Sequence, residues 1–369
     1  MKIKVTHLTS VHKRYDVRIF HKMCCSLAKN PDYQVSLVVA DGKGDEIKEG
    51  VFIYDVGTIF GGRIFRMTNI VYRIFNRAKV LDSDIYHFHD PELIPTCLKL
   101  KKTGKKVVFD IHEDYVLQIL GKNWIPIVFR KFLSIAYQNL EFYACKRFDL
   151  LIVPQISMKR KFEKLNKTVL IANFPNRIPV KPTIRTAFNK FRLIYSGRIS
   201  EDRGIWNILD FTSELYKINK NYSLTLVGEI NDSLLKRIQS HEAWQITKYL
   251  GVLSRKDLYE VYNHNSIGLI LFNNVGQYFM AYSLKLFEYL QNGMFVIIPN
   301  FGDWIAFNEN YQVGLNVDPN NAFESAIVLD QCNIELLEAR STDNRSKVDK
   351  FFSWESQEPI LYASYISIL

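Results

Sequence analysis

The sequence of 369 residues lacks any hydrophobic run near the roughly 18 residues that a membrane-spanning helix needs, so we expect no transmembrane segment. Residues 1–10 alternate like a strand and lack the continuous apolar stretch of a signal peptide. The five cysteines are an odd number without metal-ligand spacing, and we interpret them as reduced structural thiols. These absences together predict a folded protein that stays in the cytoplasm.

Several motifs that would assign a ligand are also absent. The sequence contains no G-x-G-x-x-G, so a dinucleotide site of the usual kind is not predicted. It contains no helix-turn-helix, RNP-like strand or zinc module, which argues against nucleic acid as a partner. Asp82-Ser83-Asp84 has the D-x-D pattern of some metal sites, but it precedes a predicted strand, and we interpret it as a loop. We therefore expect no metal ion and no other cofactor.

Positive charge is concentrated in one half of the chain. Residues 1–180 contain 30 Lys and Arg against 17 Asp and Glu, a balance of +13, whereas the remainder contains 18 against 21, a balance of −3. A surface with such a balance attracts anionic partners. We therefore expect the N-terminal half to face phospholipid or an acidic or phosphorylated substrate.

The length fits two domains of roughly 150 to 200 residues each. Strand-like and helix-like stretches alternate in both halves, which predicts two doubly wound, Rossmann-like α/β domains. We place the first domain at 1–172, a proline-containing linker at 173–190 and the second domain at 191–351. The expected strands are 2–8, 33–39, 84–88, 106–111, 150–153, 191–195, 223–227, 267–272 and 295–298, and the expected helices include 16–29, 92–102, 124–147 and 205–216.

The stretch from Ser283 to Gly293 predicts a short helix that is followed directly by a strand. Its apolar residues recur at helical spacing, Ser283 is an acceptable N-cap, and Gly293 is a natural left-handed stop. Lys285 and Glu288 stand three apart and therefore share one face of the helix. An isolated pair of this kind is most often a solvated surface ion pair, so its role depends on the loops around it.

Ligands in open parallel sheets bind beyond the carboxyl ends of the strands, so the loops after strands are candidate sites. His12, His89 and His112 each follow a predicted strand of the first half, close in sequence to carboxylates. Three histidines at one edge of a sheet indicate a functional site.

A comparable loop follows the first strand of the second half. Gly197 there lets the backbone come close to a ligand, and Arg198 and Arg203 could neutralise a diphosphate. We therefore predict a second, anion-binding site in the second domain.

Two segments of the first half suggest a membrane surface. In residues 59–80 four arginines fall within an arc of roughly 80°, with apolar residues over much of the rest of the helix. This pattern suits a surface of anionic lipid, and it also fits a domain helix with solvated arginines. Residues 122–147 combine aromatic and basic residues and suit either the same role or a helix that covers the sheet. The arginines predicted to face the membrane are Arg63, Arg66, Arg73 and Arg77.

Five stretches resemble, in their order along the chain, the motifs of a known family. They are SVHKRYDVRIFHK, DIYHFHDPELIP, VVFDIHEDY, IYSGRISEDRGI and SLKLFEYLQNGMFVI. With them the sequence resembles the family 4 glycosyltransferases of the GT-B fold, in particular the bacterial cell-surface polysaccharide branch. The terminal stretch FFSWESQEPILYASYISIL, residues 352–369, resembles the last helix of that family, which crosses back to the first domain.

The resemblance implies two Rossmann-like domains facing a cleft and a retaining, metal-independent transfer of a hexosyl or N-acetylhexosaminyl group. A UDP- or GDP-linked sugar would be held by the second domain, and the acceptor by the basic first domain. Negative charge develops on the diphosphate as it departs, and fixed cations beside it lower the barrier.

Carried over to this sequence, the resemblance also implies roles for individual residues. Arg198 and Arg203 would hold the diphosphate, Glu288 would hold the ribose hydroxyls, and His112 would contact the transferring sugar. The other donor-side residues are Gly197, Gly276, Lys285 and Leu286, and the acceptor-side residues are His12, Arg14, Asp16, Arg18, His89 and Glu113.

The sequence departs from the family pattern at one position. Many relatives carry two glutamates eight apart, and the residue eight before Glu288 is Met280.

We expect a protein that adds a sugar to a polyprenyl-diphosphate-linked glycan at the inner face of the cell membrane, in O-antigen, capsule or exopolysaccharide biosynthesis. A nucleotide-sugar epimerase or hydrolase of the same fold, and a non-catalytic assembly subunit, are the alternatives. The base and sugar of the donor, the linkage formed and the oligomeric state do not follow from the sequence.

Overall fold

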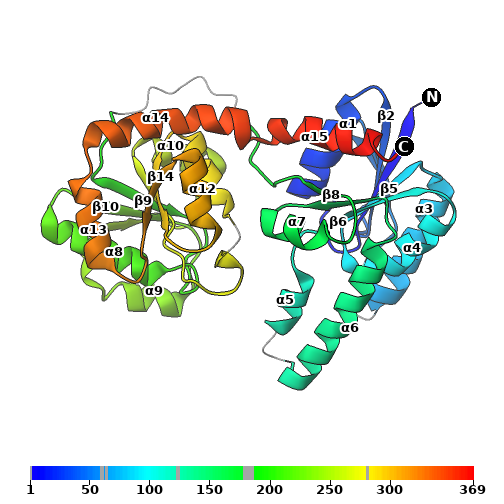
Figure 1. Cartoon of the computed structure of the whole chain (residues 1–369), viewed down its shortest axis with the longest axis horizontal. Coiled ribbons are helices and arrows are strands. Elements are labelled where there is room, and N and C mark those ends of the chain that lie inside the picture. Colours follow the sequence, from blue (N-terminus) through cyan, green and yellow to red (C-terminus); the bar gives the residue numbers. More distant parts are fainter. Residues whose placement is uncertain (1, 59–61, 63–64, 122–124, 178–186, 280–281) are drawn as a thin grey trace. The chain divides into compact units, whose positions relative to one another are not determined.

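The computed structural model describes residues 2–58, 62, 65–121, 125–177, 187–279 and 282–369. The chain forms two compact units (Figure 1). Unit 1 comprises Met1–Asn173 and Gln357–Leu369, and unit 2 comprises Phe174–Ser356. Both units are α/β, each around its own largely parallel sheet, as the alternation of strand-like and helix-like stretches predicts.

Unit 1 is built on an eight-stranded sheet with the order β3-β4-β2-β1-β5-β6-β7-β8. Neighbouring strands run parallel, except that β3 at the edge is antiparallel to β4. β1 lies between β2 and β5, so the strand order reverses there, and such switch points are where open sheets bind ligands. The strands are β1 (Ile3–Leu8), β2 (Tyr33–Val39), β3 (Glu46–Lys48), β4 (Val51–Asp55), β5 (Ile85–Phe88), β6 (Lys106–Asp110), β7 (Leu150–Val153) and β8 (Thr168–Leu170).

The helix predicted over 16–29 is present but begins as a π-helical segment, η1, and continues as an α-helix. Asp16 caps it, because its carboxylate accepts hydrogen bonds from the backbone N–H groups of Arg18 and Ile19. The helical elements of unit 1 are η1 (Val17–Cys24), α1 (Cys25–Lys29), η2 (Arg66–Ile70), α3 (Val71–Leu81), η3 (Pro91–Leu93), α4 (Ile94–Lys102), α5 (Tyr115–Leu120), α6 (Ile127–Cys145), α7 (Ile156–Phe162) and, from Gln357 onwards, α15 (Trp354–Ile366).

The C-terminal helix packs on unit 1, as the resemblance implies. Glu358 of α15 accepts a hydrogen bond of 2.6 Å from the hydroxyl of Ser26, and Tyr362 donates one of 2.8 Å to the carbonyl oxygen of the same residue. Deeper in the unit, the Tyr365 hydroxyl lies 2.5 Å from Nδ1 of His87, so α15 is part of the core and not an appendage.

The described part of the predicted membrane helix 59–80, from residue 65 onwards, packs on the core of unit 1. Ile70, Val71 and Ile74, from the apolar side of η2 and α3, are buried in the hydrophobic core of unit 1 and are not available to a lipid surface. Arg73 donates to the carbonyl oxygen of Val56 at 3.3 Å, and Arg77 lies 3.8 Å from Asp45 and over the ring of Tyr54. The structure therefore corrects the membrane-facing assignment for the described part of this helix, and Arg63 lies outside the described residues.

Unit 2 is built on a six-stranded parallel sheet with the order β11-β10-β9-β12-β13-β14. β9 lies between β10 and β12, which again creates a switch point at its carboxyl end. The strands are β9 (Arg192–Ser196), β10 (Ser223–Val227), β11 (Thr247–Tyr249), β12 (Ile267–Leu269), β13 (Phe295–Pro299) and β14 (Gly314–Val317). The helical elements are α8 (Ile205–Ile218), α9 (Asp232–Ile238), η4 (Glu242–Ile246), α10 (Arg255–Asn263), η5 (Gly276–Phe279), α11 (Leu284–Gln291), α12 (Asp303–Tyr311), α13 (Ala322–Gln331) and α14 (Ile334–Phe351).

The helix predicted between Ser283 and Gly293 is α11, and Ser283 occupies its N-cap position. Its buried face includes Lys285 and Tyr289, whereas Leu284 is exposed. The helix is therefore rotated from the orientation that its apolar residues alone predict, and it carries a lysine into the protein. None of the described helices of either unit is long and apolar enough to cross a membrane.

α11 packs so closely on β12 that a glycine is required between them. A Cβ atom at Gly268 would lie 2.3 Å from Cδ2 of Tyr289, whose buried ring also accepts a hydrogen bond of 2.8 Å at its hydroxyl from the backbone N–H of Ser196. We predict that Gly268→Ala lowers the free energy of unfolding by about 1–3 kcal/mol in urea titrations, because the rigid ring has to shift.

Gly62→Ala is the matched control for this substitution. A Cβ atom at Gly62 would have no neighbour within 4 Å among the described residues, so the free energy of unfolding should change by less than about 0.5 kcal/mol. Equal values for the two variants would show that the contact between β12 and α11 is looser than described.

Candidate active site

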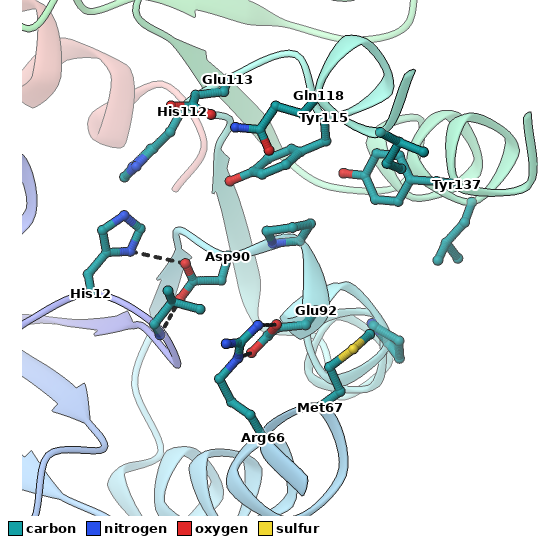
Figure 2. A pocket seen from close by; sticks show the side chains of 15 residues that line it. His12, Arg66, Met67, Asp90, Glu92, His112, Glu113, Tyr115, Gln118 and Tyr137 are labelled. Atoms are coloured by element: carbon teal, nitrogen blue, oxygen red, sulfur yellow. Dashed lines mark hydrogen bonds and ion pairs between the residues drawn. The ribbon is translucent and has the colours of Figure 1, made fainter. Parts of the chain in front are cut away.

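A pocket of about 570 Å³ opens beyond the carboxyl ends of β1, β5 and β6 in unit 1 (Figure 2). The loops after these three strands supply histidines and carboxylates to it, and α5 and α6 supply Tyr115, Gln118 and Tyr137. The residues with ionisable side chains that line it include His12, Arg66, Asp90, Glu92, His112 and Glu113. The predicted site at this edge of the sheet therefore corresponds to a real cavity.

Asp90 fixes the loop that follows β1. One carboxylate oxygen accepts hydrogen bonds from the Thr9 hydroxyl at 2.7 Å and the Ser10 backbone N–H at 2.6 Å, and the other lies 3.0 Å from Nδ1 of His12. Burial raises the pKa of Asp90, but His12 and the hydrogen bonds from Ser10 and Thr9 outweigh it and lower the pKa to about 2. Burial also lowers the pKa of His12, but Asp90 more than compensates and raises it. The pair places a protonatable imidazole at the mouth of the pocket.

Arg66 lines this pocket, whereas the sequence pattern predicted that it would face a membrane. Its guanidinium donates two hydrogen bonds to the carboxylate of Glu92, at 2.7 and 2.9 Å, as Figure 2 shows. Glu92 also accepts a hydrogen bond of 2.7 Å from the Ser10 hydroxyl. The charge of Arg66 is therefore used to shape the pocket wall.

Asp110, at the end of β6, is a fully buried carboxylate beneath the pocket. Arg18 donates two hydrogen bonds to it, at 2.9 and 2.7 Å, and Nε2 of His112 and Nδ1 of His89 lie 2.8 and 3.2 Å from its Oδ2. Burial raises the pKa of Asp110, but Arg18 and the two histidines lower it well below its ordinary value. Burial lowers the pKa of His89 to about 4, so its ring is neutral at neutral pH. Asp110 thereby holds His112 at the pocket surface.

The predicted acceptor-side residues divide into lining residues and supports. Arg14 forms ion pairs with Asp41 and Glu46, each at 2.6 Å, and Asp16 caps η1, so both side chains are engaged away from the cavity. The lining residues are His12 and Glu113, and the supports are Arg14, Asp16, Arg18 and His89.

Sequence reasoning missed the wall of the pocket that α5 and α6 form. Tyr137 lines it and donates a hydrogen bond of 2.9 Å to Glu141, and burial raises the pKa of Glu141 to about 7. The two residues stand four apart, so helical periodicity could have paired them, but it could not show which way the helix faces.

In unit 2, the loops after β9 and β10 touch at two glycines. A Cβ atom at Gly228 would lie 1.9 Å from the carbonyl oxygen of Gly197, so only glycine fits there. A Cβ atom at Gly197 would lie 3.4 Å from Nζ of Lys285 and 3.9 Å from Nη1 of Arg203. The exposed backbone at Gly197 is thus bordered by two cations, as the sequence predicts for an anion site.

Lys285 is not part of a surface ion pair. It is only 5% exposed, its Nζ lies 3.5 Å from the centroid of the Tyr195 ring, and it makes no hydrogen bond with any residue that the structure describes. Burial and the nearby Arg203 lower the pKa of Lys285 well below its ordinary value, and Glu288 opposes them. A buried amine with these surroundings is protonated more readily when an anion lies close to it.

The other predicted donor-side residues surround this lysine to different degrees. Arg198 is exposed, Arg203 is half-buried with its Nε 3.4 Å from the Tyr278 hydroxyl, and the half-buried Glu288 has an oxygen 3.5 Å from the Tyr262 hydroxyl. The polar groups therefore gather at the carboxyl end of β9 and along α11.

The remaining assignments concern the loop before α11 and one core residue. Leu286 is fully buried in the core of unit 2, so its side chain supports α11 and does not line a site. Gly276 begins the short helix η5. Met280 lies outside the described residues.

Two sets of side chains in unit 1 have potential metal-binding atoms within 4.8 Å of one another. In the first, Nδ1 of His7 and Nε2 of His89 lie 2.9 Å apart, and Nδ1 of His87 is bonded to Tyr365, so the rings are engaged with each other and with that hydroxyl. The second is built on Asp110. That the protein needs no metal stays a prediction. The sets are His7, His87 and His89, and His89, Asp110 and His112.

Two family models match the chain. The model described as Glycosyltransferase Family 4 matches residues 17–174, and the model described as Glycosyl transferases group 1 matches residues 181–332. Together they span nearly all of both predicted domains. The chain belongs to glycosyltransferase family 4. The family and the GT-B fold that the motifs indicate are thereby confirmed, and the cell-surface polysaccharide branch stays a prediction.

Solved structures of glycosyltransferases share this fold along the whole chain, at low sequence identity. A sucrose-phosphate synthase from Thermosynechococcus elongatus matches with a TM-score of 0.73 and 14% identity, covering 100% of this chain and 99% of that one. The Anabaena protein HepE in complex with UDP gives 0.67 and 13%, covering 100% of both chains. An E. coli trehalose-6-phosphate structure bound with UDP-2-fluoro glucose gives 0.69 and 12%, covering 98% of both. A search of curated proteins finds no match.

The Asp90 carboxylate of this glycosyltransferase should contribute to the loss of stability at low pH. Its stabilising effect is present above its ordinary pKa of 3.8 and is lost as the pH falls toward about 2, which corresponds to about 2 kcal/mol. We predict that Asp90→Asn flattens the loss of stability over this range in urea titrations. The same change should lower the pKa of His12, measured from its ring resonances by NMR, because its carboxylate partner is gone.

Asp202→Asn, at an exposed position in unit 2, is the control and should keep the wild-type acid profile. A His12 resonance that titrates identically in Asp90→Asn and in the wild type would contradict the pairing of Asp90 with His12.

Proposed function

We propose that this chain is a retaining glycosyltransferase that moves a hexosyl or N-acetylhexosaminyl group from a UDP- or GDP-linked sugar to a polyprenyl-diphosphate-linked glycan. The reaction takes place at the cytoplasmic face of the cell membrane, in the biosynthesis of a cell-surface polysaccharide. Unit 2 binds the donor, and the pocket of unit 1 binds the acceptor.

The observation that carries the donor assignment is the buried ammonium of Lys285 beneath the exposed backbone of Gly197. Burial lowers the pKa of this amine, and it has no hydrogen-bond partner among the described residues, so a bound anion would favour its protonated form and be attracted by it. Arg203 lies beside it and Arg198 follows in the same loop, so three cations gather at one strand end. A diphosphate has the charge that this cluster lacks.

This cluster also suits the chemistry of the transfer step. When the bond between the sugar and the diphosphate breaks, negative charge builds up on the departing oxygens, and preorganised cations stabilise it. Lys285, Arg198 and Arg203 supply that charge, so the proposed mechanism needs no metal ion. Glu288, half-buried on α11, is placed to accept hydrogen bonds from the ribose hydroxyls.

The nucleotide is proposed as UDP or GDP. Two solved structures of the same fold contain uridine nucleotides, namely HepE with UDP and the E. coli structure with UDP-2-fluoro glucose. A further solved structure of this fold, a trehalose-6-phosphate synthase, is described in terms of glycosyl transfer with retention. These likenesses support retention and a uridine nucleotide as the first choices to test.

The acceptor assignment rests on unit 1. Its pocket combines His12 and His112, which can exchange protons, with a wall from α5 and α6 that is partly apolar. The hydroxyl groups of a glycan suit the two histidines, and a lipid tail suits the apolar wall. Sucrose-phosphate and trehalose-phosphate synthases share the fold, so the assay has to compare a sugar phosphate with the lipid-linked glycan as the acceptor.

Lys285→Met separates donor binding from folding. We predict that the wild-type melting temperature rises with UDP or GDP, by the equivalent of about 2.7 kcal/mol at a hundredfold excess over Kd, and that the variant loses this rise. Without ligand the variant should melt at the wild-type temperature or above it, because a buried cation is replaced by an apolar chain of similar length. Differential scanning fluorimetry over a panel of nucleotide diphosphates and nucleotide-sugars measures both effects.

Lys248→Met, at an exposed lysine of β11, is the control and should keep the nucleotide response. A response that survives in Lys285→Met would contradict the donor site. A protein that no nucleotide diphosphate or nucleotide-sugar stabilises would instead be the expected behaviour of a non-catalytic assembly subunit.

Glu288→Ala and Arg198→Ala test catalysis itself. Each should lower turnover by about 10²- to 10³-fold while leaving the unfolding midpoint unchanged, because each removes one contact to the donor. Release of the nucleotide diphosphate is measured with lipid-linked glycan, with a sugar phosphate and without acceptor. Unchanged turnover in both variants would contradict the donor site. Full release of the nucleotide diphosphate without any acceptor would identify a hydrolase, and conversion of the nucleotide-sugar to an epimer without net release would identify an epimerase.

A further inference from the structure

The helical hairpin of unit 1 formed by α5 and α6 exposes an unusual number of large apolar side chains. At its tip Val128 is 72% exposed, Phe132 is 69% exposed and Ile135 is 58% exposed. Figure 1 shows α5 and α6 projecting from the sheet of unit 1. The other exposed apolar residues of the hairpin are Leu117, Leu120, Ile127, Phe129, Leu133, Leu140 and Tyr143.

The tip of α6 exposes apolar side chains over most of its circumference, interrupted by Arg130, Lys131 and Ser134, which distinguishes it from an ordinary surface helix. Over residues 127–136, where every residue is described, Ser134 alone is buried and Arg130 alone is half-buried. An amphipathic helix on a protein surface exposes charges and buries its apolar face, as α3 does. Contiguous exposed apolar surface in a soluble protein marks a binding site.

Charge around the hairpin selects its partner. Residues 115–147 contain five basic residues and one acidic residue, Glu141. Glu141 is buried beside Tyr137 at the base and does not offset the cations at the surface. Lys131 is exposed at the tip, and Arg147 lies with its guanidinium 3.5 Å over the ring of Tyr143. Apolar and aromatic side chains bordered by cations match the interfacial layer of a bilayer with anionic lipids.

A protein groove would fit this surface less well than a membrane. A groove covers one face of a helix, and the other faces would still expose Phe and Ile to water. A bilayer surrounds an inserted tip, so it covers the apolar side chains on these several faces at once.

The base of the hairpin is a wall of the acceptor pocket. Ile119 of α5 and Tyr137 and Leu140 of α6 line the pocket, whereas the tip residues do not. A molecule anchored in a bilayer by an apolar chain would therefore meet the pocket along the hairpin without leaving the membrane.

We propose that the α5–α6 hairpin docks unit 1 on an anionic bilayer by inserting its apolar tip, and that it presents the pocket to an acceptor carried by a lipid. The identity of that acceptor rests on the proposed function, whereas the docking itself does not.

The docking is tested by co-flotation with vesicles of phosphatidylglycerol and phosphatidylethanolamine, and of phosphatidylcholine alone, in the absence of any nucleotide or glycan. The wild type should float with the anionic vesicles, less strongly as salt is raised, and weakly with phosphatidylcholine. The triple variant Val128→Gln, Phe132→Gln, Ile135→Gln should lower the partition coefficient by about a hundredfold, because three apolar side chains no longer enter the interface.

The matched control replaces three equally exposed apolar residues elsewhere, Val80→Gln, Val252→Gln and Phe323→Gln. This variant should float like the wild type. Circular dichroism melting of both triple variants confirms that each is folded. Because none of the tip residues lines the pocket, turnover with a short-chain, water-soluble acceptor should be unchanged in the tip variant, whereas turnover with acceptor in vesicles should fall.

Three results would overturn the proposal. The wild type could ignore anionic vesicles, or the tip variant could float as well as the control. Alternatively, sedimentation could show a concentration-dependent dimer that the tip variant abolishes, with no vesicle binding, which would identify a second copy of the chain as the partner. Failure of the donor tests with intact flotation would refute the proposed reaction and leave the docking in place.

Discussion

The buried carboxylate of Asp110 is the constraint on which unit 1 depends. A fully desolvated charge is tolerated only with partners in good geometry, and here a bidentate arginine and two imidazoles provide them. Arg18 also donates to the carbonyl oxygen of Ile171, so the carboxylate fixes η1, the end of β6 and the chain after β8 at once. This network also positions one wall of the pocket, because Oδ2 of Asp110 forms a hydrogen bond with His112.

Unit 2 handles a buried charge in the opposite way. Lys285 has aromatic rings around it and an arginine nearby, and no residue that the structure describes accepts a hydrogen bond from it. Glycines at 197 and 228 bring the backbone of two loops against the same place. Unit 1 thus satisfies its own buried charge, whereas unit 2 leaves the Lys285 amine without a hydrogen-bond partner among the described residues, which supports the proposal that unit 2 binds an anionic ligand.

The sequence allowed the larger plan of this protein to be predicted, because buried parallel strands and their connecting helices leave strong patterns. The strands at 33–39, 150–153 and 223–227 were predicted to the residue. The strands β3, β4, β8, β11 and β14 were not predicted, because three to five residues carry too little periodicity to be recognised alone. Short strands at the edge of a sheet are in general difficult to predict from hydrophobic periodicity for this reason.

Individual site residues were predictable as positions and less so as roles. His12 and His112 reached the pocket because both follow strands at one edge of the sheet. Arg198 and Arg203 follow β9, and Lys285 reaches the same loop from α11. Whether a polar residue lines a cavity or supports it depends on rotation and burial, which distinguish His89 from His112 although both follow strands. The helix at 59–80 shows the same limit, since an amphipathic pattern fixes which face is apolar and not what covers it.

The return of α15 to unit 1 has a consequence for the order in which the protein acquires its structure during synthesis. Tyr365, which closes the buried histidine cluster at His87, leaves the ribosome after all of unit 2. Unit 2, formed by a single continuous segment, holds all its residues at that time, whereas unit 1 still lacks part of its core. The first domain to be translated is therefore the last to hold all of its residues.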